Sequence, residues 1–70
     1  MTFEKMKPKV GDRIRITCNG RKIEGEAKTV DGTLRSGYGI EMVDDNGKYR
    51  YWKQWTDGGY VIVLKRASDA

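Results

Sequence analysis

Residues 13–27, RIRITCNGRKIEGEA, predict two antiparallel strands joined by a tight turn. Apolar residues alternate with charged or polar ones on both sides of Asn19-Gly20, which is the period of a strand that buries one face. Asn and Gly both tolerate the positive φ angles of a type I′ turn, so this pair is a strong hairpin signal. We therefore expect two sets of residues to point inward: Ile14, Ile16 and Cys18 from the first strand, and Ile23, Gly25 and Ala27 from the second.

Four turn signals of this kind occur in the 70 residues: Asn19-Gly20, Asp31-Gly32, Asn46-Gly47 and Asp57-Gly58-Gly59. They separate five strand-like runs, at residues 13–18, 21–30, 38–43, 48–55 and 60–64. Val30 breaks the alternation of the second run, which predicts a bulge near Lys28 or Thr29. The last run is apolar throughout, and we expect it to be buried on much of both faces. No segment has the apolar period of a helix, so no helix longer than one turn is expected.

This spacing predicts an all-β fold, a five-stranded antiparallel SH3-like barrel that hides its sheet edges. An OB-fold is the alternative, but the short turn at residues 44–47 leaves no room for the helix that an OB-fold carries there. Seventy residues allow one domain, which we divide into a flexible basic leader at 1–9, the barrel at 10–66 and a C-terminal tail at 67–70.

The residue types limit which stabilising bonds, metal sites and catalytic groups this chain can form. One cysteine, Cys18, and no histidine leave neither an intrachain disulfide nor a Cys/His zinc site to support a thin core. The oligomeric state stays open, because association is another way to stabilise a small domain. Without histidine the usual pairs of nucleophile and base are missing, so we expect neither an enzyme nor a cofactor. The Asp44-Asp45-Asn46-Gly47 segment lacks the ligand spacing of an EF-hand and predicts an ordinary turn, with no metal.

The net charge of +4 lies mostly near the two ends of the chain. Residues 1–9 carry +2 and residues 65–70 carry +1, whereas residues 10–64 hold nine basic and eight acidic side chains. Basicity alone therefore argues only weakly for a nucleic-acid partner. The lone thiol and the absence of an apolar N-terminal segment predict a cytoplasmic protein, and the longest apolar run, 60–64, is too short to span a membrane.

Residues 10–16, VGDRIRI, followed by Gly20 and by Glu24-Gly25, resemble the opening of SH3-like domains, among them KOW-type nucleic-acid modules and small phage and bacterial domains. The layout of the whole chain is also similar to that of the type II dihydrofolate reductases, which share the Gly-Asp-Arg opening and a Gly-Tyr pair at the third strand. Where that family has Val-Gln-Ile-Tyr, this chain has Tyr49-Arg50-Tyr51-Trp52. This second similarity therefore implies a shared fold class and not the reductase activity.

Residues 48–55 are the candidate functional segment, because cations and aromatic residues alternate along them. Lys48, Arg50 and Trp52 share one face, which we expect to be exposed because of its cations, with Tyr49 and Tyr51 pointing inward. Exposed rings beside cations suit single-stranded nucleic acid, since bases stack on the rings for about 1–3 kcal/mol each and the cations attract phosphates. The predicted nucleic-acid-binding residues are Arg13, Arg15, Lys48, Arg50, Trp52 and Lys53.

The leading hypothesis is thus a small accessory module that binds DNA or RNA. The alternative is a protein-interaction domain, phage-encoded or part of a larger assembly. A position of Glu24, Glu26, Glu41 and Asp44 beside the exposed aromatics would favour this alternative. The same aromatics also suit a cage for a methylated cation, as in Tudor-like barrels, or a groove for a proline-rich peptide. In a core this small, Trp52 or Trp55 is alternatively a packing residue.

Overall fold

The computed structural model describes residues 7–33 and 35–67, which form one five-stranded antiparallel sheet. The elements are β1 (Arg13–Cys18), β2 (Arg21–Thr33), β3 (Gly37–Asp44), β4 (Tyr49–Lys53), the helical turn α1 (Gln54–Asp57) and β5 (Tyr60–Lys65). The strand order is β4-β3-β2-β1-β5, so β4 and β5 are the two edges of the sheet. The predicted all-β class, the five antiparallel strands and the limit of one helical turn are confirmed for the described residues.

The turn between β1 and β2 has the predicted geometry. Asn19 and Gly20 both have positive φ angles, 51° and 75°, as a type I′ turn requires. Cys18 is paired with Arg21 and Ile16 with Ile23, so the apolar residues of the two strands lie side by side on one face. The register of this hairpin follows directly from its two turn residues.

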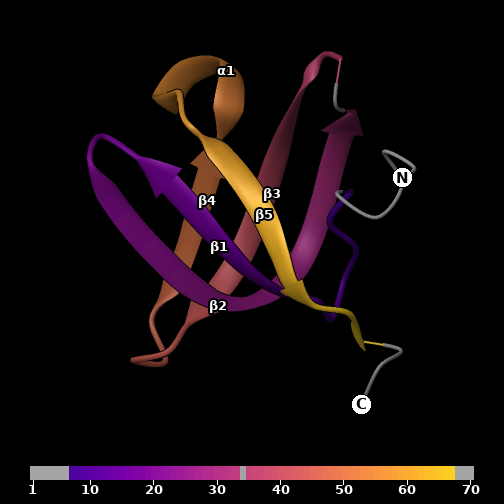
Figure 1. Cartoon of the computed structure of the whole chain (residues 1–70), viewed down its shortest axis with the longest axis vertical. Coiled ribbons are helices and arrows are strands. Elements are labelled where there is room, and N and C mark those ends of the chain that lie inside the picture. Colours follow the sequence, from indigo (N-terminus) through magenta and orange to yellow (C-terminus); the bar gives the residue numbers. More distant parts are fainter. Residues whose placement is uncertain (1–6, 34, 68–70) are drawn as a thin grey trace.

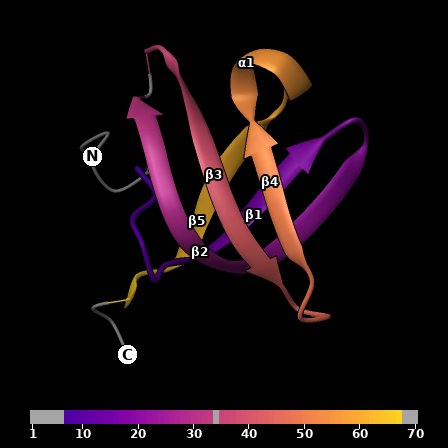
Figure 2. The same ribbon diagram turned by 180° about the vertical axis from the view of Figure 1, so that it is seen from behind.

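The long strand β2 bends sharply, and this bend folds the sheet over on itself (Figure 1). Seen from both sides, β1 and β5 form one layer, β3 and β4 form the other, and β2 passes through both (Figure 2). The register shifts between Ala27 and Thr29, which confirms the predicted bulge. Just before it, a Cβ on Gly25 would lie 2.1 Å from the Val43 carbonyl oxygen, so the two strands approach this closely only because residue 25 is glycine.

The core lies between the two layers of the folded sheet. Its fully buried apolar residues come from four strands: Ile14, Ile16, Ala27, Tyr38, Ile40, Met42 and Trp52. Cys18, Ile23, Val30, Val61 and Val63 are partly buried and pack against this cluster. The inward faces predicted for the first two strands are therefore confirmed.

The chain reverses within the connection predicted at residues 31–37, but the first of its turn signals, Asp31-Gly32, is not the turn. Asp31 and Gly32 lie within β2, where they pair with Gly39 and Tyr38 of β3. The chain reverses instead between Thr33 and Gly37, where the Ser36 hydroxyl and the Thr33 side chain are 2.8 Å apart and each also accepts a backbone N–H of the other residue. Gly32 does have a positive φ of 89°, but a long hairpin accommodates that glycine inside its paired region.

The fourth strand is shorter than predicted, and its two faces are the reverse of those predicted. β4 ends at Lys53, and Gln54–Asp57 form α1 instead of continuing the strand to Trp55. Trp52 is only 4% exposed, whereas Tyr49 and Tyr51 point to solvent. The polar atom of the buried Trp52 ring has a partner at the edge of the core, where the indole N–H donates to the Gly58 carbonyl at 2.9 Å.

The expectation that the last run is buried on both faces is also wrong. Among the described residues, β5 pairs only with β1 and forms one edge of the sheet. Val61 and Val63 pack against the core, but Tyr60 and Leu64 on the opposite face are exposed. No helix in residues 7–33 and 35–67 is long and apolar enough to cross a membrane.

The two ends of the domain meet at Asp12. Its carboxylate accepts the backbone N–H groups of Lys9 and Ala67, at 2.9 Å each, and a guanidinium hydrogen of Arg66 at 3.0 Å. Pro8, in the same segment, is also buried. The rest of the proposed leader and tail, residues 1–6 and 68–70, lies outside the described residues.

Candidate functional site

Four of the six residues predicted to bind nucleic acid are engaged elsewhere in the fold. Trp52 is buried, so neither face of its ring is open to a base. Arg13 binds Asp45 through two hydrogen bonds, of 2.9 and 2.8 Å, and lies 3.3 Å from Glu24. Arg15 donates to Glu24 at 2.8 Å. The outer surface of β1 and β2 is thus a network of ion pairs. Within it, the hydrogen bond from Arg13 lowers the pKa of Asp45.

Arg50 also binds a carboxylate, that of Asp44, which directly precedes the Asp45 bound by Arg13. Its Nε donates to Asp44 at 3.0 Å, and Asp44 is nearly buried. The other Asp44 oxygen accepts the backbone N–H groups of Asn46 and Lys48. The bond from Lys48 N–H, followed by that from Arg50, lowers the pKa of Asp44. The two backbone bonds of this carboxylate close the turn before β4, and the Arg50 bond joins the turn to the strand. A turn at residues 44–47 is what the sequence predicts.

Lys48 and Lys53, the other two predicted residues, are exposed. Lys53 belongs to the outer face of β4, which we define as Tyr49, Tyr51 and Lys53. The side chains of this face alternate along the strand with the inward Arg50 and Trp52. Lys48 precedes the strand directly, so an exposed cation lies at each end of a pair of exposed tyrosines.

The rings at this surface lie against glycines of β3. A Cβ on Gly39 would be 3.5 Å from the Tyr51 hydroxyl oxygen, and a Cβ on Gly37 would be 3.5 Å from Trp55 Cδ1. Tyr51 remains 63% exposed and Trp55 79% exposed. Because glycine adds no side chain, each aromatic residue approaches the backbone closely and still leaves most of its surface open.

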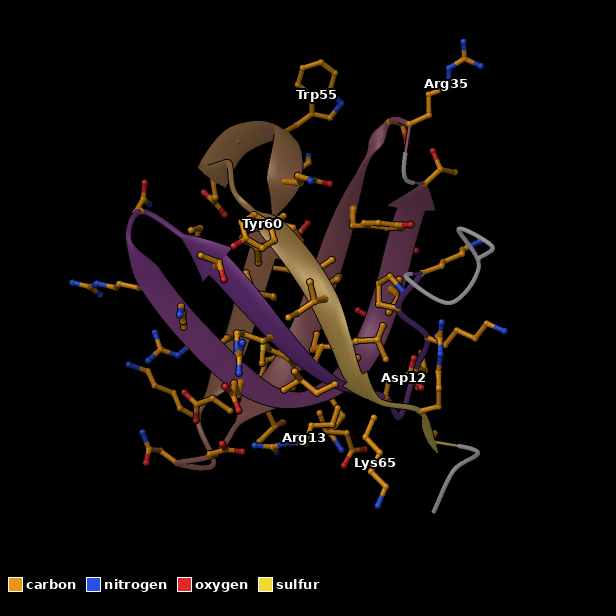
Figure 3. The ribbon with its side chains drawn as sticks, viewed as in Figure 1. Asp12, Arg13, Arg35, Trp55, Tyr60 and Lys65 are labelled. Carbon is orange, nitrogen blue, oxygen red and sulfur yellow. The ribbon has the colours of Figure 1, made fainter. Side chains whose placement is uncertain are left out.

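Trp55 is held in place by its neighbour Gln54. The Gln54 side chain accepts the Tyr38 N–H at 3.0 Å and donates to the Gly59 carbonyl at 3.1 Å, which ties α1 to β3 and to the start of β5. Trp55 and Gln54 line a shallow groove of about 260 Å³ together with residues 35–37. Trp55 and Arg35 both point away from the molecule at this end (Figure 3).

The surplus positive charge is carried by side chains outside the ion pairs. In residues 7–33 and 35–67, five cations (Arg13, Arg15, Lys28, Arg50 and Arg66) pair with five carboxylates (Asp12, Glu24, Glu26, Asp44 and Asp45). Of the thirteen cations and eight carboxylates in these ranges, eight and three respectively remain. Lys48, Lys53 and Arg35 are among the eight, so every cation flanking the exposed rings of β4 and α1 lacks a carboxylate partner in the described part of the chain.

Sequence reasoning missed Tyr49, Tyr51, Trp55 and Arg35. The alternation that groups the two tyrosines with Lys53 is visible in the sequence, but alternation does not tell which face is buried. The alternation places Trp55 in the same strand, and no local signal indicates the helical turn that displaces it. Arg35 lies in the connection between β2 and β3, and no sequence pattern marks it as a binding residue.

Comparison with protein-family models, with curated proteins and with solved structures found no match to this chain.

Proposed function

We propose that this protein is a small module that binds single-stranded DNA or RNA along the outer face of β4. The observation that carries the proposal is the set of exposed rings, Tyr49, Tyr51 and Trp55. They are flanked by Lys48, Lys53 and Arg35, which have no carboxylate partner in the described residues. Bases of any sequence stack on such rings, and the cations attract the phosphates between them. The proposal keeps the fourth strand as the site but moves it to the opposite face, with Arg35 and Trp55 in place of Arg50 and Trp52.

The ion pairs of Arg13, Arg15 and Arg50 support this narrower location. A phosphate that binds one of these guanidinium groups has to displace a carboxylate already bound at 3.0 Å or less. Lys48, Lys53 and Arg35 require no such exchange. We therefore expect binding to depend on these three cations, and log K to fall with log salt with a slope of about −2, near −0.7 for each phosphate neutralised.

Fluorescence anisotropy with labelled oligodeoxythymidylate and oligouridylate at low salt tests the proposal. We expect Tyr51→Ala and Trp55→Ala each to weaken binding by about tenfold, since one stacked base contributes about 1–3 kcal/mol. Tyr51→Phe keeps the ring and should bind like the wild type. A chain that binds neither oligonucleotide at low salt, or two alanine variants that bind like the wild type, would contradict the proposal.

A matched pair of lysine variants distinguishes binding at the outer face of β4 from a general effect of net charge. Lys53→Ala removes a cation from the outer face of β4, and Lys22→Ala removes an exposed cation from β2. Both variants lose one positive charge, so a difference in oligonucleotide affinity between them shows which position contacts the ligand. We expect Lys53→Ala to reduce both the affinity and the salt slope, and Lys22→Ala to change them little.

We also propose that the folded sheet is an SH3-like barrel. Its support is the strand order, the sharp bend of β2 and the single helical turn between the last two strands. In such a barrel the layer of β1 and β5 packs across the core against the layer of β3 and β4. NMR through-space contacts between the Val61 or Val63 methyl groups and the Trp52 ring test this arrangement, and their absence would indicate an open sheet.

A protein partner is the second candidate, and one observation favours it. Glu41 lies opposite Tyr51 in the β3–β4 register and accepts a hydrogen bond from Thr29, so a carboxylate stands beside the exposed rings. Glu41→Gln distinguishes the candidates. If the surface binds nucleic acid, removing this negative charge should tighten oligonucleotide binding, and if it binds a protein the variant should leave weak oligonucleotide binding unchanged.

A further inference from the structure

The second edge of the sheet, β5, carries no feature of the candidate site. Within residues 7–33 and 35–67 it pairs with β1 alone. Every second residue of an antiparallel strand directs its N–H and C=O away from the neighbour it is paired with. On an edge strand these groups are a template for a further strand.

The residues of β5 favour pairing of this edge with a further strand. The strand reads YVIVLK, with no glycine, no proline and no charge before Lys65. Val61 and Val63 face the core, which leaves Tyr60, Ile62 and Leu64 as an apolar row on the outer side, with Tyr60 55% exposed. Natural edge strands are usually protected by charges, prolines or bulges. The one irregularity of β5 lies at its end, where the register against β1 shifts at Leu64, because Ile14 pairs with Val63 but Arg13 with Lys65. Residues 60–63 pair regularly with β1 and form the open part of the edge.

The other edge has such protection. β4 spans only Tyr49–Lys53 and contains two cations, Arg50 and Lys53. It also leads directly into α1, which ends the strand. Strand addition is therefore disfavoured at β4 and favoured at β5.

We propose that two copies of this chain pair through β5 and form an antiparallel dimer with its two-fold axis at Ile62. In this register Ile62 lies opposite itself and Val61 opposite Val63, all in the regular part of the strand, and Tyr60 lies opposite Leu64 at the register shift. The outer rows of the two copies then join into one apolar patch, in which aromatic–aliphatic and β-branched pairs each stabilise the interface by about 0.2–1 kcal/mol.

The charges of the strand fit a second copy. Tyr60 and Lys65 lie at opposite ends of β5, so antiparallel pairing keeps the two Lys65 side chains far apart (Figure 3). Arg15, beside Ile62 on β1, is already neutralised by Glu24. Pairing β5 with itself uses the same surface on both copies and closes at two, whereas pairing β5 with β4 of the next copy would continue without limit.

The proposal does not rest on the nucleic-acid function. β5 lies in the front layer of Figure 1 and β4 in the back layer, so dimer formation leaves the outer face of β4 accessible. It also bears on stability, because a chain of this length buries little surface by itself and small domains often gain stability by association.

Sedimentation equilibrium over a range of concentrations tests the dimer. The monomer mass is 8.0 kDa, and the wild type should approach twice this value as concentration rises. A mass that stays at 8.0 kDa up to millimolar concentration would overturn the proposal. Species that grow beyond the dimer would overturn it as well, because they indicate head-to-tail pairing.

Two double variants at exposed positions test the register. Tyr60→Lys with Leu64→Glu places opposite charges across the proposed interface, and Tyr60→Lys with Leu64→Lys places like charges there. Within one chain the two positions are too far apart along the strand to interact directly. We expect the Lys/Glu variant to dimerise and the Lys/Lys variant to have a dissociation constant about tenfold higher or more.

Both variants should keep the circular dichroism of the wild type, since neither changes a core residue. Equal dissociation constants for the two variants would reject the proposed register. Oligonucleotide binding by the monomeric Lys/Lys variant then reports the proposed function separately, so either proposal can fail alone.

Discussion

Asp12 joins two parts of the chain that are far apart in sequence. Only 2% of it is exposed, yet both carboxylate oxygens have partners, in Lys9, Ala67 and Arg66. Burial alone would raise its pKa, but the hydrogen bonds from Ala67, Lys9 and Arg66 outweigh burial and hold the pKa below its usual value. This one side chain therefore ties the end of β5 to the segment before β1.

We predict that Asp12→Ala lowers the free energy of unfolding by about 3 kcal/mol. The change removes the acceptor of two partly buried backbone N–H groups, and a buried N–H group without an acceptor costs about 1–3 kcal/mol. Asp12→Asn should cost less, because an amide oxygen can still accept one of these bonds. Urea unfolding checks both variants, and Asp57→Ala, at an exposed aspartate of α1, is the control. An Asp12→Ala variant as stable as this control would contradict the assignment.

At the scale of elements, β2 determines the shape of the molecule. It pairs with β1 over its first part and with β3 over its second, and the bulge after Ala27 lies at the change of layers. Gly25 permits the close crossing of β3 at this bend. The outer face of β4 depends on this geometry indirectly. β3 pairs with β4, and it contains the two glycines that lie against Tyr51 and Trp55.

We predict that Gly25→Ala destabilises the fold by at least about 2 kcal/mol, because its methyl group would lie 2.1 Å from the Val43 carbonyl oxygen. Gly39→Ala is the matched control. It also lies in a strand without a positive φ, and its methyl group would meet only the Tyr51 hydroxyl at 3.5 Å. Thermal unfolding should show a large loss for the first variant and a small change for the second. Similar losses in both would indicate that β2 and β3 do not cross this closely.

For the whole molecule, the distribution of charge predicts how stability depends on pH. The pKa values of Asp12, Asp44 and Asp45 all lie below the ordinary value of 3.8. A carboxylate with a depressed pKa stabilises the fold above its unfolded pKa, and that contribution disappears as pH falls through the folded value. Asp45 is exposed, so its share is small.

We therefore predict that the free energy of unfolding is constant from neutral pH to about pH 5 and falls steadily below about pH 4. Urea unfolding at a series of pH values measures this decline. Asp12→Asn should be less stable at neutral pH but should lose less stability on acidification. An unchanged slope in this variant would show that Asp12 is not a main cause of acid unfolding.

Much of the fold could be predicted from local chemistry. Asn19-Gly20 specifies its turn because the backbone angles belong to those two residues, and the alternation of Ile14 and Ile16 specifies the buried face of β1. Asp31-Gly32 was misplaced because a positive φ is compatible both with a turn and with an irregular position in a long hairpin. The site was only half predictable, since the strand was correct and the exposed face was not.

What the sequence alone determined is the set of strands, three of their turns and the grouping of side chains into faces, because these depend on residues close together in the chain. The tertiary structure decided which face of β4 is buried, because Trp52 fits between the two layers and finds the Gly58 carbonyl there. It also decided which cations are paired, since Arg13 meets Asp45 from a turn 32 residues away. Such choices depend on contacts between distant segments, which exist only once the sheet has folded over.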